Sequence, residues 1–209
     1  MTNVLLIIFI ISLVYLGIAN RLQTFINIIA IQGIILFWVI LFELHEVSTV
    51  NLVFILFETI VFKAIAVPAF LMYLIKRNRM TREAEPFLHN FTSLLVITFI
   101  IVVTIVLSYL ISDTYVNKIY FVVALSTLFT GLFLIATRRK IITHVMGYLV
   151  IENGVFVLSL AVGNEMPMLL NMGIMLDIFA SVLILGIFLN KIGDVLKDVD
   201  VNQLRNLKD

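Results

Sequence analysis

Long apolar runs limit what this chain can fold into more than any other feature of its sequence. Of its 209 residues, 62% are hydrophobic and 13% are charged. The apolar residues gather into runs of roughly 20, which at about 1.5 Å rise per helical residue matches the hydrocarbon thickness of a bilayer. Runs of this length are too long for a soluble core. The sequence therefore predicts a polytopic integral membrane protein of the all-α class.

Charged and polar breaks divide the chain into about seven candidate transmembrane helices. We expect one transmembrane domain over 1–209, with a three-helix part at 1–75, a four-helix part at 91–190 and a cytoplasmic tail at 191–209. The first run is expected to remain as a helix, because Met1-Thr2-Asn3 has no basic n-region and no convincing cleavage site follows. The predicted spans lie near residues 3–19, 22–42, 48–75, 91–112, 117–136, 140–163 and 167–190.

Basic residues fall on alternate loops and so predict the orientation. They occur at Arg21, in KRNRMTRE at 76–83, in RRK at 138–140 and from Lys191 onward, whereas the intervening loops carry ELHE, SDTY and GNE. The positive-inside rule then places the N-terminus outside and the C-terminus in the cytoplasm. We expect a multi-pass protein of the prokaryotic cell (inner) membrane.

The chain has no cysteine and a net charge of +1. It therefore cannot form a disulfide, a thiolate-ligated iron–sulfur cluster or a cysteine-based zinc site. The loops are too short for a soluble catalytic domain, and nothing indicates nucleic-acid binding. We expect no catalytic residue, metal or cofactor on this chain.

Ionisable side chains interrupt some spans near their midpoints. A charge there costs about 2.5–3.5 kcal/mol on insertion scales, so Lys63, Glu152 and Asp177 are expected to face inward and to serve a function. Three such groups at one depth favour a proton relay, which His144 could feed from the cytoplasmic side unless it only snorkels to the interface. The alternative is that these charges pair between helices and fix their register. The spans near 22–42, 48–75, 140–163 and 167–190 carry the polar side chains, namely Gln23, Asn27, Gln32, Glu58, Lys63, His144, Glu152, Asn153, Asp177 and Ser181.

The third span contains its own irregularity. Glu58 and Lys63 are five residues apart and point about 140° away from each other, so each must find a partner on another helix. Pro68 cannot donate to the carbonyl of Ala64, which predicts a kink and a free acceptor beside the lysine.

Several segments resemble a known family. They are GYLVIENGVFVLSLA at 147–161, NMGIMLDIFASVLILGIFLNKI at 171–192, the tail VDVNQLRNLKD and K-x-x-x-V-P at 63–68. Together they resemble the E component of the hydrogenase-4 and formate hydrogenlyase type of membrane-bound nickel–iron hydrogenases. The region 117–190 also looks like the K subunit of respiratory complex I and the C subunit of Mrp-type antiporters. In the complex I subunit two membrane glutamates belong to the proton pathway; one lines up with Asp177, and Glu152 is displaced from the other by about one turn.

The resemblance implies a small membrane-arm subunit packed between antiporter-like subunits, with the nickel, the iron–sulfur clusters and any formate chemistry on other chains. The side chains expected in its proton or sodium path are Glu152, Asp177, Lys63, Glu58 and His144, supported by Asn153, Gln32 and Ser181 and by a kink at Pro68. Two alternatives remain, namely a subunit of a multi-subunit cation/proton antiporter and a purely structural membrane spacer.

The cysteine-free sequence allows the topology to be tested directly. Single cysteines replacing Asp113 and Glu165 should react with an impermeant maleimide in intact cells. Cysteines replacing Arg79, Arg139 and Asp209 should react only after permeabilisation, because these positions are expected in the cytoplasm. A residue that labels with the opposite set would overturn the seven-span arrangement.

Overall fold

The computed structural model describes residues 1–43, 53, 56–57, 59–77, 84, 87–110, 117–162 and 186. Over these ranges the chain is helical and contains no β-strand, as expected. The elements are α1 (Thr2–Ile18), α2 (Leu22–Glu43), the π-helix η1 (Thr59–Ala66), α4 (Val67–Arg77), α5 (Asn90–Leu110), α6 (Lys118–Thr137) and α7 (Ile141–Val162).

Five helices in the described part of the chain are long and apolar enough to cross a membrane. They cover Leu22–Phe42, Thr59–Lys76, Asn90–Leu110, Lys118–Thr137 and Ile141–Ala161. The first predicted span corresponds to α1, a shorter apolar helix of 17 residues. The seventh, at 167–190, lies outside the described residues except for Gly186, so the count of seven stays a prediction.

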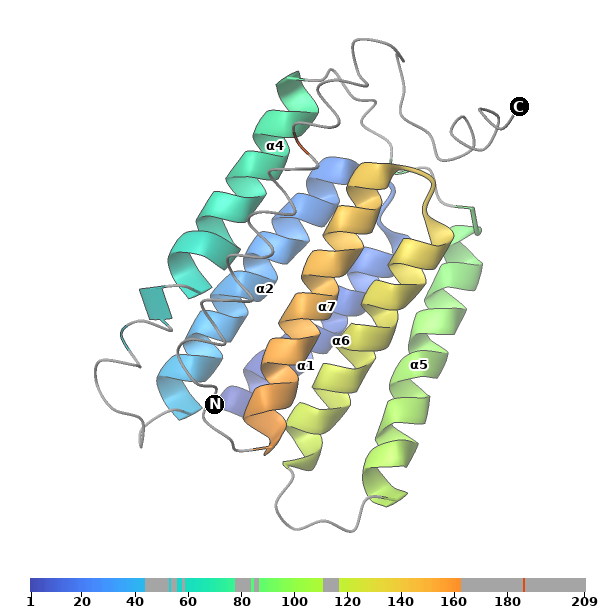
Figure 1. Ribbon diagram of the computed structural model, residues 1–209. Coiled ribbons are helices and arrows are strands. Elements are labelled where there is room, and N and C mark those ends of the chain that lie inside the picture. Colours follow the sequence, from blue (N-terminus) through green and yellow to red (C-terminus); the bar gives the residue numbers. More distant parts are fainter. Residues whose placement is uncertain are drawn as a thin grey trace.

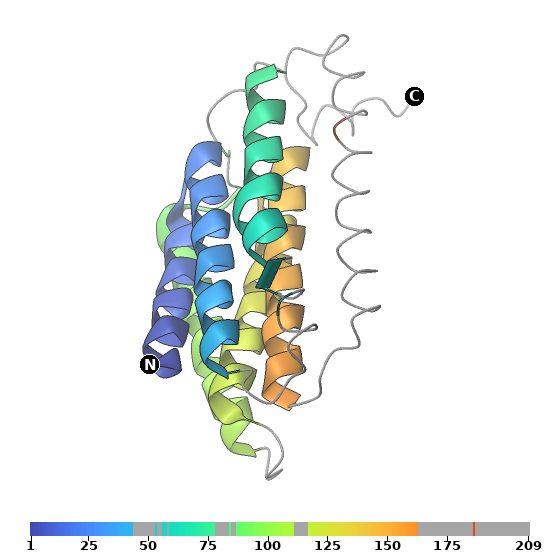
Figure 2. The same ribbon diagram turned by 90° about the vertical axis from the view of Figure 1, so that its left-hand side faces the viewer.

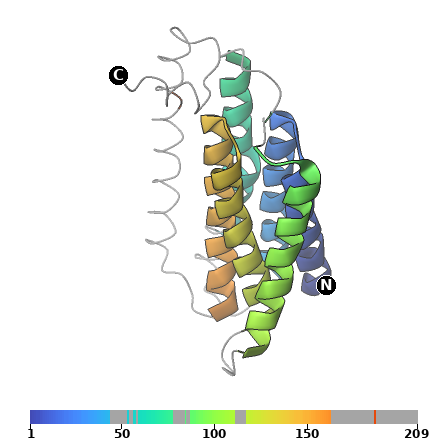
Figure 3. The same cartoon turned by 90° about the vertical axis from the view of Figure 1, so that its right-hand side faces the viewer.

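The helices form an up-and-down bundle in which successive helices run in opposite directions, with η1 and α4 together forming one of them (Figure 1). The helices α6 and α7 pack most extensively against each other, and α1 packs against α2, α5 and α6. Figure 2 shows α4 beside α2 with α7 behind, and Figure 3 shows α5 next to α1 on the other side of the bundle.

Glycines bring the backbones of α6 and α7 into direct contact. A Cβ atom added at Gly154 would lie 2.9 Å from the backbone nitrogen of Leu128, and one at Gly131 would lie 2.8 Å from the carbonyl oxygen of Gly147. In a bilayer, small residues allow helices to approach and gain van der Waals contact where the hydrophobic effect between helices is absent. These glycines therefore fix how α7 is turned relative to α6.

The basic linkers meet at one end of the bundle, where the α1–α2 linker, the end of α4 and the α6–α7 linker lie together (Figure 1). Arg138 is 2% exposed there, and its Nη2 donates to the carbonyl oxygen of Gly17 at 3.0 Å. Its guanidinium also lies 5.0 Å from the ring centroid of Phe25. Burial lowers the pKa of Arg138 to about 10, so the side chain stays charged at neutral pH. The cation thus ties α1 and α2 to the α6–α7 turn.

We expect Gly154→Val to destabilise the bundle, because the added methyl groups meet the backbone of α6 and cannot be accommodated by a rotamer change. Overpacking of this kind costs about 1–3 kcal/mol. The control Ala136→Val introduces the same side chain at an exposed position of α6 and should leave stability unchanged. Heating purified protein in mild detergent and measuring the fraction that remains soluble distinguishes the two. Equal behaviour of both variants would contradict close α6–α7 packing.

Candidate functional site: a buried ion pair between helices

Lys63 lies on the π-helix η1, directly before α4. Proline has no N–H and cannot close the helical hydrogen bond to the residue four positions earlier, here Ala64. The structure places the irregularity just upstream, in a π-helical segment that ends at Ala66, two residues before Pro68. Such segments are rare in proteins and are frequent at functional sites. The sequence indicated the break through Pro68 but did not reveal its π-helical form.

Gly33 of α2 lets η1 approach at Lys63. A Cβ atom at Gly33 would lie 3.0 Å from both the backbone carbon of Lys63 and the backbone nitrogen of Ala64. The two backbones therefore touch, and any larger residue would push η1 away from α2. Gly33 sets the position from which the lysine side chain extends.

The ammonium of Lys63 forms an ion pair with the carboxylate of Glu152 on α7. Both side chains are buried, with 8% and 9% exposure. The ring of Phe156, one turn further along α7, has its centroid 4.4 Å from Lys63 Nζ and adds a cation–π contact. The prediction that Lys63 would find its partner on another helix is confirmed.

The turn of α7 that carries Glu152 also carries a second polar connection. Asn153 donates to Gln32 Oε1 at 3.2 Å, and Gln32 donates to Ser12 Oγ at 3.0 Å. The Ser12 hydroxyl in turn donates to the carbonyl oxygen of Phe9 at 2.6 Å. Adjacent residues of α7 thus reach η1 through an ion pair and reach α2 and α1 through hydrogen bonds.

Helical periodicity explains why the motif G-Y-x-x-x-E-N-G produces this arrangement. Gly147 and Gly154 are seven residues apart and share one face of α7, whereas Glu152 is turned away from that face by roughly 140–160°. The glycines contact α6, so the glutamate is directed to the opposite side, toward η1. The spacing of the motif therefore determines where its charge points.

The other predicted site residues are distributed differently. Glu58, Asp177 and Ser181 lie outside the described residues, so their predicted places in the path stay predictions. His144 is half-buried on α7, about 12 Å along the helix axis from Glu152, and among the described residues its imidazole makes no hydrogen bond. Pro68 is buried in α4. Within the described ranges no three His, Cys, Asp or Glu residues cluster as a metal ion would require.

Sequence reasoning missed the hydroxyl groups of the apolar spans. Ser12 belongs to a predicted span without an acidic, basic or histidine side chain, yet it completes the hydrogen-bonded chain from Asn153 and Gln32. Thr104 of α5 and Ser126 of α6 likewise share a buried hydrogen bond of 2.7 Å. A single serine in an apolar run is the only sequence signal, and it does not say which helix the hydroxyl will contact.

Comparison with known proteins gives one weak relative. The chain is 24% identical over 86 residues to the uncharacterized protein Rv0085 of Mycobacterium tuberculosis, and the match covers 41% of this chain and 39% of that protein. The matched stretch is thus well under half the length of the relative. No family model and no solved structure matches the chain. Its function must therefore be argued from the site.

The ion pair can be tested by removing its members singly and together. Breaking a buried pair leaves one uncompensated charge and typically costs about 3–5 kcal/mol, whereas replacing both partners by apolar residues is often neutral. Lys63→Met and Glu152→Met should each lower the free energy of unfolding, and the double variant should be more stable than either. Unfolding in mixed detergent micelles would measure this double-mutant cycle. Additive losses would mean that the two charges do not interact in the folded protein.

Proposed function

We propose that this chain is a non-catalytic membrane-arm subunit of a complex I-related, membrane-bound nickel–iron hydrogenase of the prokaryotic cell membrane. Its part would be to lend intramembrane charges to proton or sodium translocation, while electron transfer takes place on other chains. The buried Lys63–Glu152 ion pair carries this proposal. It lies at the middle of α7, inside the motif that resembles the hydrogenase family.

The chemistry of the cluster separates groups that can change charge from groups that only position them. Amide side chains do not titrate under physiological conditions, so Asn153 and Gln32 hold α7, α2 and α1 in register. Lys63 and Glu152 are the two members of the cluster that can gain or lose a proton. Any proton transfer in this cluster must therefore use them.

The pair provides a simple exchange step. When a proton reaches Glu152, its carboxylate becomes neutral and Lys63 loses its counter-ion. An ammonium without a counter-ion is costly in an apolar interior. Protonation of Glu152 therefore favours release of a proton from Lys63. One proton has then entered and one has left. Phe156 stabilises the ammonium through its ring in the interval before release.

Asp177, Glu58 and His144 would extend this step into a path, as the sequence pattern predicts. The partners would be antiporter-like and other membrane subunits, each with its own charged residues. Sodium is a possible cargo as well, since carboxylate and backbone oxygens bind both ions.

A structural role is a second candidate function that the same contacts support. The ion pair joins η1 to α7, and the amide chain joins α7 to α2 and α1, so the same residues could serve only to hold the bundle in register. An antiporter subunit without redox chemistry is a further alternative, suggested by the resemblance to the Mrp-type C subunit. The neighbouring reading frames would distinguish a hydrogenase complex from an antiporter complex. The first predicts genes for hydrogenase subunits beside this one, and the second predicts genes for antiporter subunits alone.

Glu152→Gln is the central test of the proposed function. Glutamine keeps the size and the hydrogen-bond acceptor but cannot ionise. The complex should assemble and pass electrons when uncoupled, while formation of a pH gradient by membrane vesicles falls sharply. Asp177→Asn should behave in the same way, and Lys63→Met should likewise reduce pH-gradient formation in the complex that assembles, at a lower yield because it leaves Glu152 without a counter-ion.

Asn153→Leu is the matched control, because it removes a buried polar group of the same cluster that does not titrate. It should reduce the yield of assembled complex and leave the number of protons moved per electron unchanged in what assembles. If an intact Glu152→Gln, Asp177→Asn double variant pumps normally, the relay is excluded and the structural role stands.

A further inference from the structure

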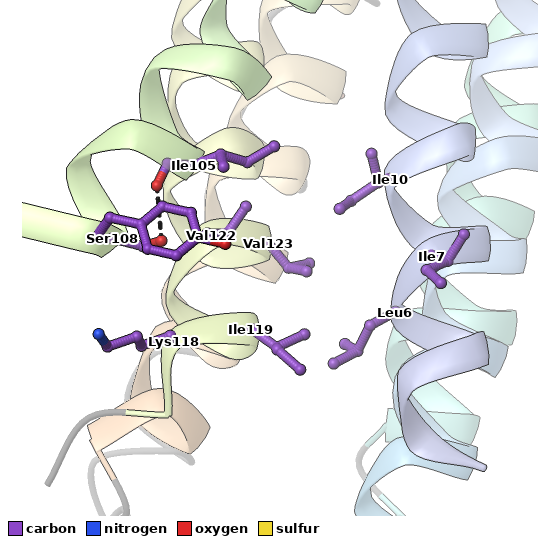
Figure 4. Close-up of a pocket in the computed structure, with 10 residues that line it drawn as sticks. Leu6, Ile7, Ile10, Ile105, Ser108, Lys118, Ile119, Val122 and Val123 are labelled. Carbon is purple, nitrogen blue, oxygen red and sulfur yellow. Dashed lines mark hydrogen bonds between the residues drawn. The ribbon is translucent and has the colours of Figure 1, made fainter. Parts of the chain in front are cut away.

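An apolar groove of about 260 Å³ lies between α1 and the α5–α6 pair, at the end of the bundle opposite the basic linkers (Figure 4). Figure 4 shows side chains of α1 on one side of the gap and side chains of α5 and α6 on the other. The apolar walls are formed by large side chains, among them Leu6, Ile7, Ile10, Ile105, Ile119 and Val122.

The groove lies at one end of the α1–α5 pair, and a close approach of the two helices lies toward the other end. The side chain of Ile97 occupies the space beside Gly17 where a Cβ atom would be, so the two helices touch there. Gly17 is near the last residue of α1 and Ile97 is in the first half of α5. Toward the beginning of α1 and the end of α5 the walls separate and form the groove.

A cation lies at the mouth of the groove. Lys118 is the first residue of α6 and is exposed. Tyr109, the residue before the last in α5, is 76% exposed. Lysine and tyrosine at the ends of membrane helices lie at the level of the lipid headgroups. Among the described lining residues Lys118 is the only one with a full charge at neutral pH.

The lining fits a lipid chain better than another helix. Helix–helix contacts in membranes use small residues and interhelical hydrogen bonds, as Gly131 and Gly154 illustrate at the α6–α7 contact. The described residues of the lining include no glycine or alanine. The serine among them, Ser108, already donates to the carbonyl oxygen of Ile105 at 2.7 Å (Figure 4). A flexible alkyl chain can fill such an irregular apolar groove without a hydrogen-bonding partner.

We propose that this groove binds one acyl chain of an anionic phospholipid whose phosphate is paired with Lys118. Tyr109, an exposed residue of the same lining, adds a hydroxyl donor near the end of α5. An anionic lipid is favoured over a zwitterionic one because the mouth offers a positive charge and no described carboxylate to hold a choline group. The proposal needs only that the helices lie in a bilayer, so it does not depend on the proposed function.

Quenching of a single tryptophan by brominated lipids would test the site. Trp38→Phe removes the one native tryptophan, and Val106→Trp adds a reporter at an exposed position beside Ile105. The protein is placed in phosphatidylcholine bilayers that contain either brominated phosphatidylglycerol or brominated phosphatidylcholine at equal mole fraction. Phosphatidylglycerol should be preferred by about fivefold, the effect of one lysine near a membrane surface.

Four substitutions in this reporter chain identify the residues responsible. Lys118→Gln should abolish the preference, and Lys118→Arg should retain it. Lys76→Gln, which removes an exposed lysine from the other end of the bundle, should also retain it and serves as the charge-matched control. Val122→Phe should fill the groove and lower quenching by phosphatidylglycerol toward that of phosphatidylcholine.

Three results would overturn the proposal. One is equal quenching by both lipids in the unaltered reporter chain. Another is a preference that survives Lys118→Gln, which would place the anionic lipid elsewhere. The third is protection of the reporter from both lipids, which would mean that a polypeptide segment and not a lipid covers the groove.

Discussion

A positive and a negative side chain buried together in an apolar bundle stabilise each other only while both are charged and in contact. Lys63 and Glu152 are in that position, and much of the surrounding structure serves to keep them there. Gly33 admits the backbone of η1, and Phe156 closes over the ammonium. Because the interior has a low dielectric constant, the interaction is far more sensitive to distance and charge than a surface ion pair would be.

Two kinds of contact hold α7, and they act on different faces. Toward α6 the contact is between backbones, through Gly131, Gly147 and Gly154. Toward η1, α2 and α1 it is between polar side chains. The backbone contacts with α6 and the amide hydrogen bonds toward α2 and α1 are insensitive to charge, whereas the ion pair toward η1 requires both Glu152 and Lys63 to be charged. The helix can therefore keep its packing on α6 while its other face responds to a change in charge.

The helices and their approximate limits could be predicted from the sequence because apolar runs of this length have few alternatives. The ends of α2, α5, α6 and α7 fall within two residues of the expected spans. That Lys63 must find its partner on another helix also followed, from the spacing of residues alone.

The identity of that partner could not be predicted. It depends on which face of α7 meets α6, and this depends on side-chain and backbone contacts between segments far apart in the sequence. The hydrogen bond of the Ser12 hydroxyl could not be predicted for the same reason, because it requires Gln32 of another helix to lie against it. The π-helical form of η1 has no signature beyond the nearby Pro68, since hydrogen-bond register is decided by packing.

The continuity of η1 with α4 has a mechanical consequence. Lys63 and Arg77 belong to one uninterrupted helical rod that spans roughly 20 Å, from the ion pair to the basic end of the bundle. A helix is stiff along its axis, so a shift of the backbone at Lys63 displaces the far end of the rod and with it the side chains of Phe70 and Leu74, which pack against Gly186. Any change at the Lys63–Glu152 contact that moves the backbone of η1 would therefore be carried along the rod to the basic end of the bundle.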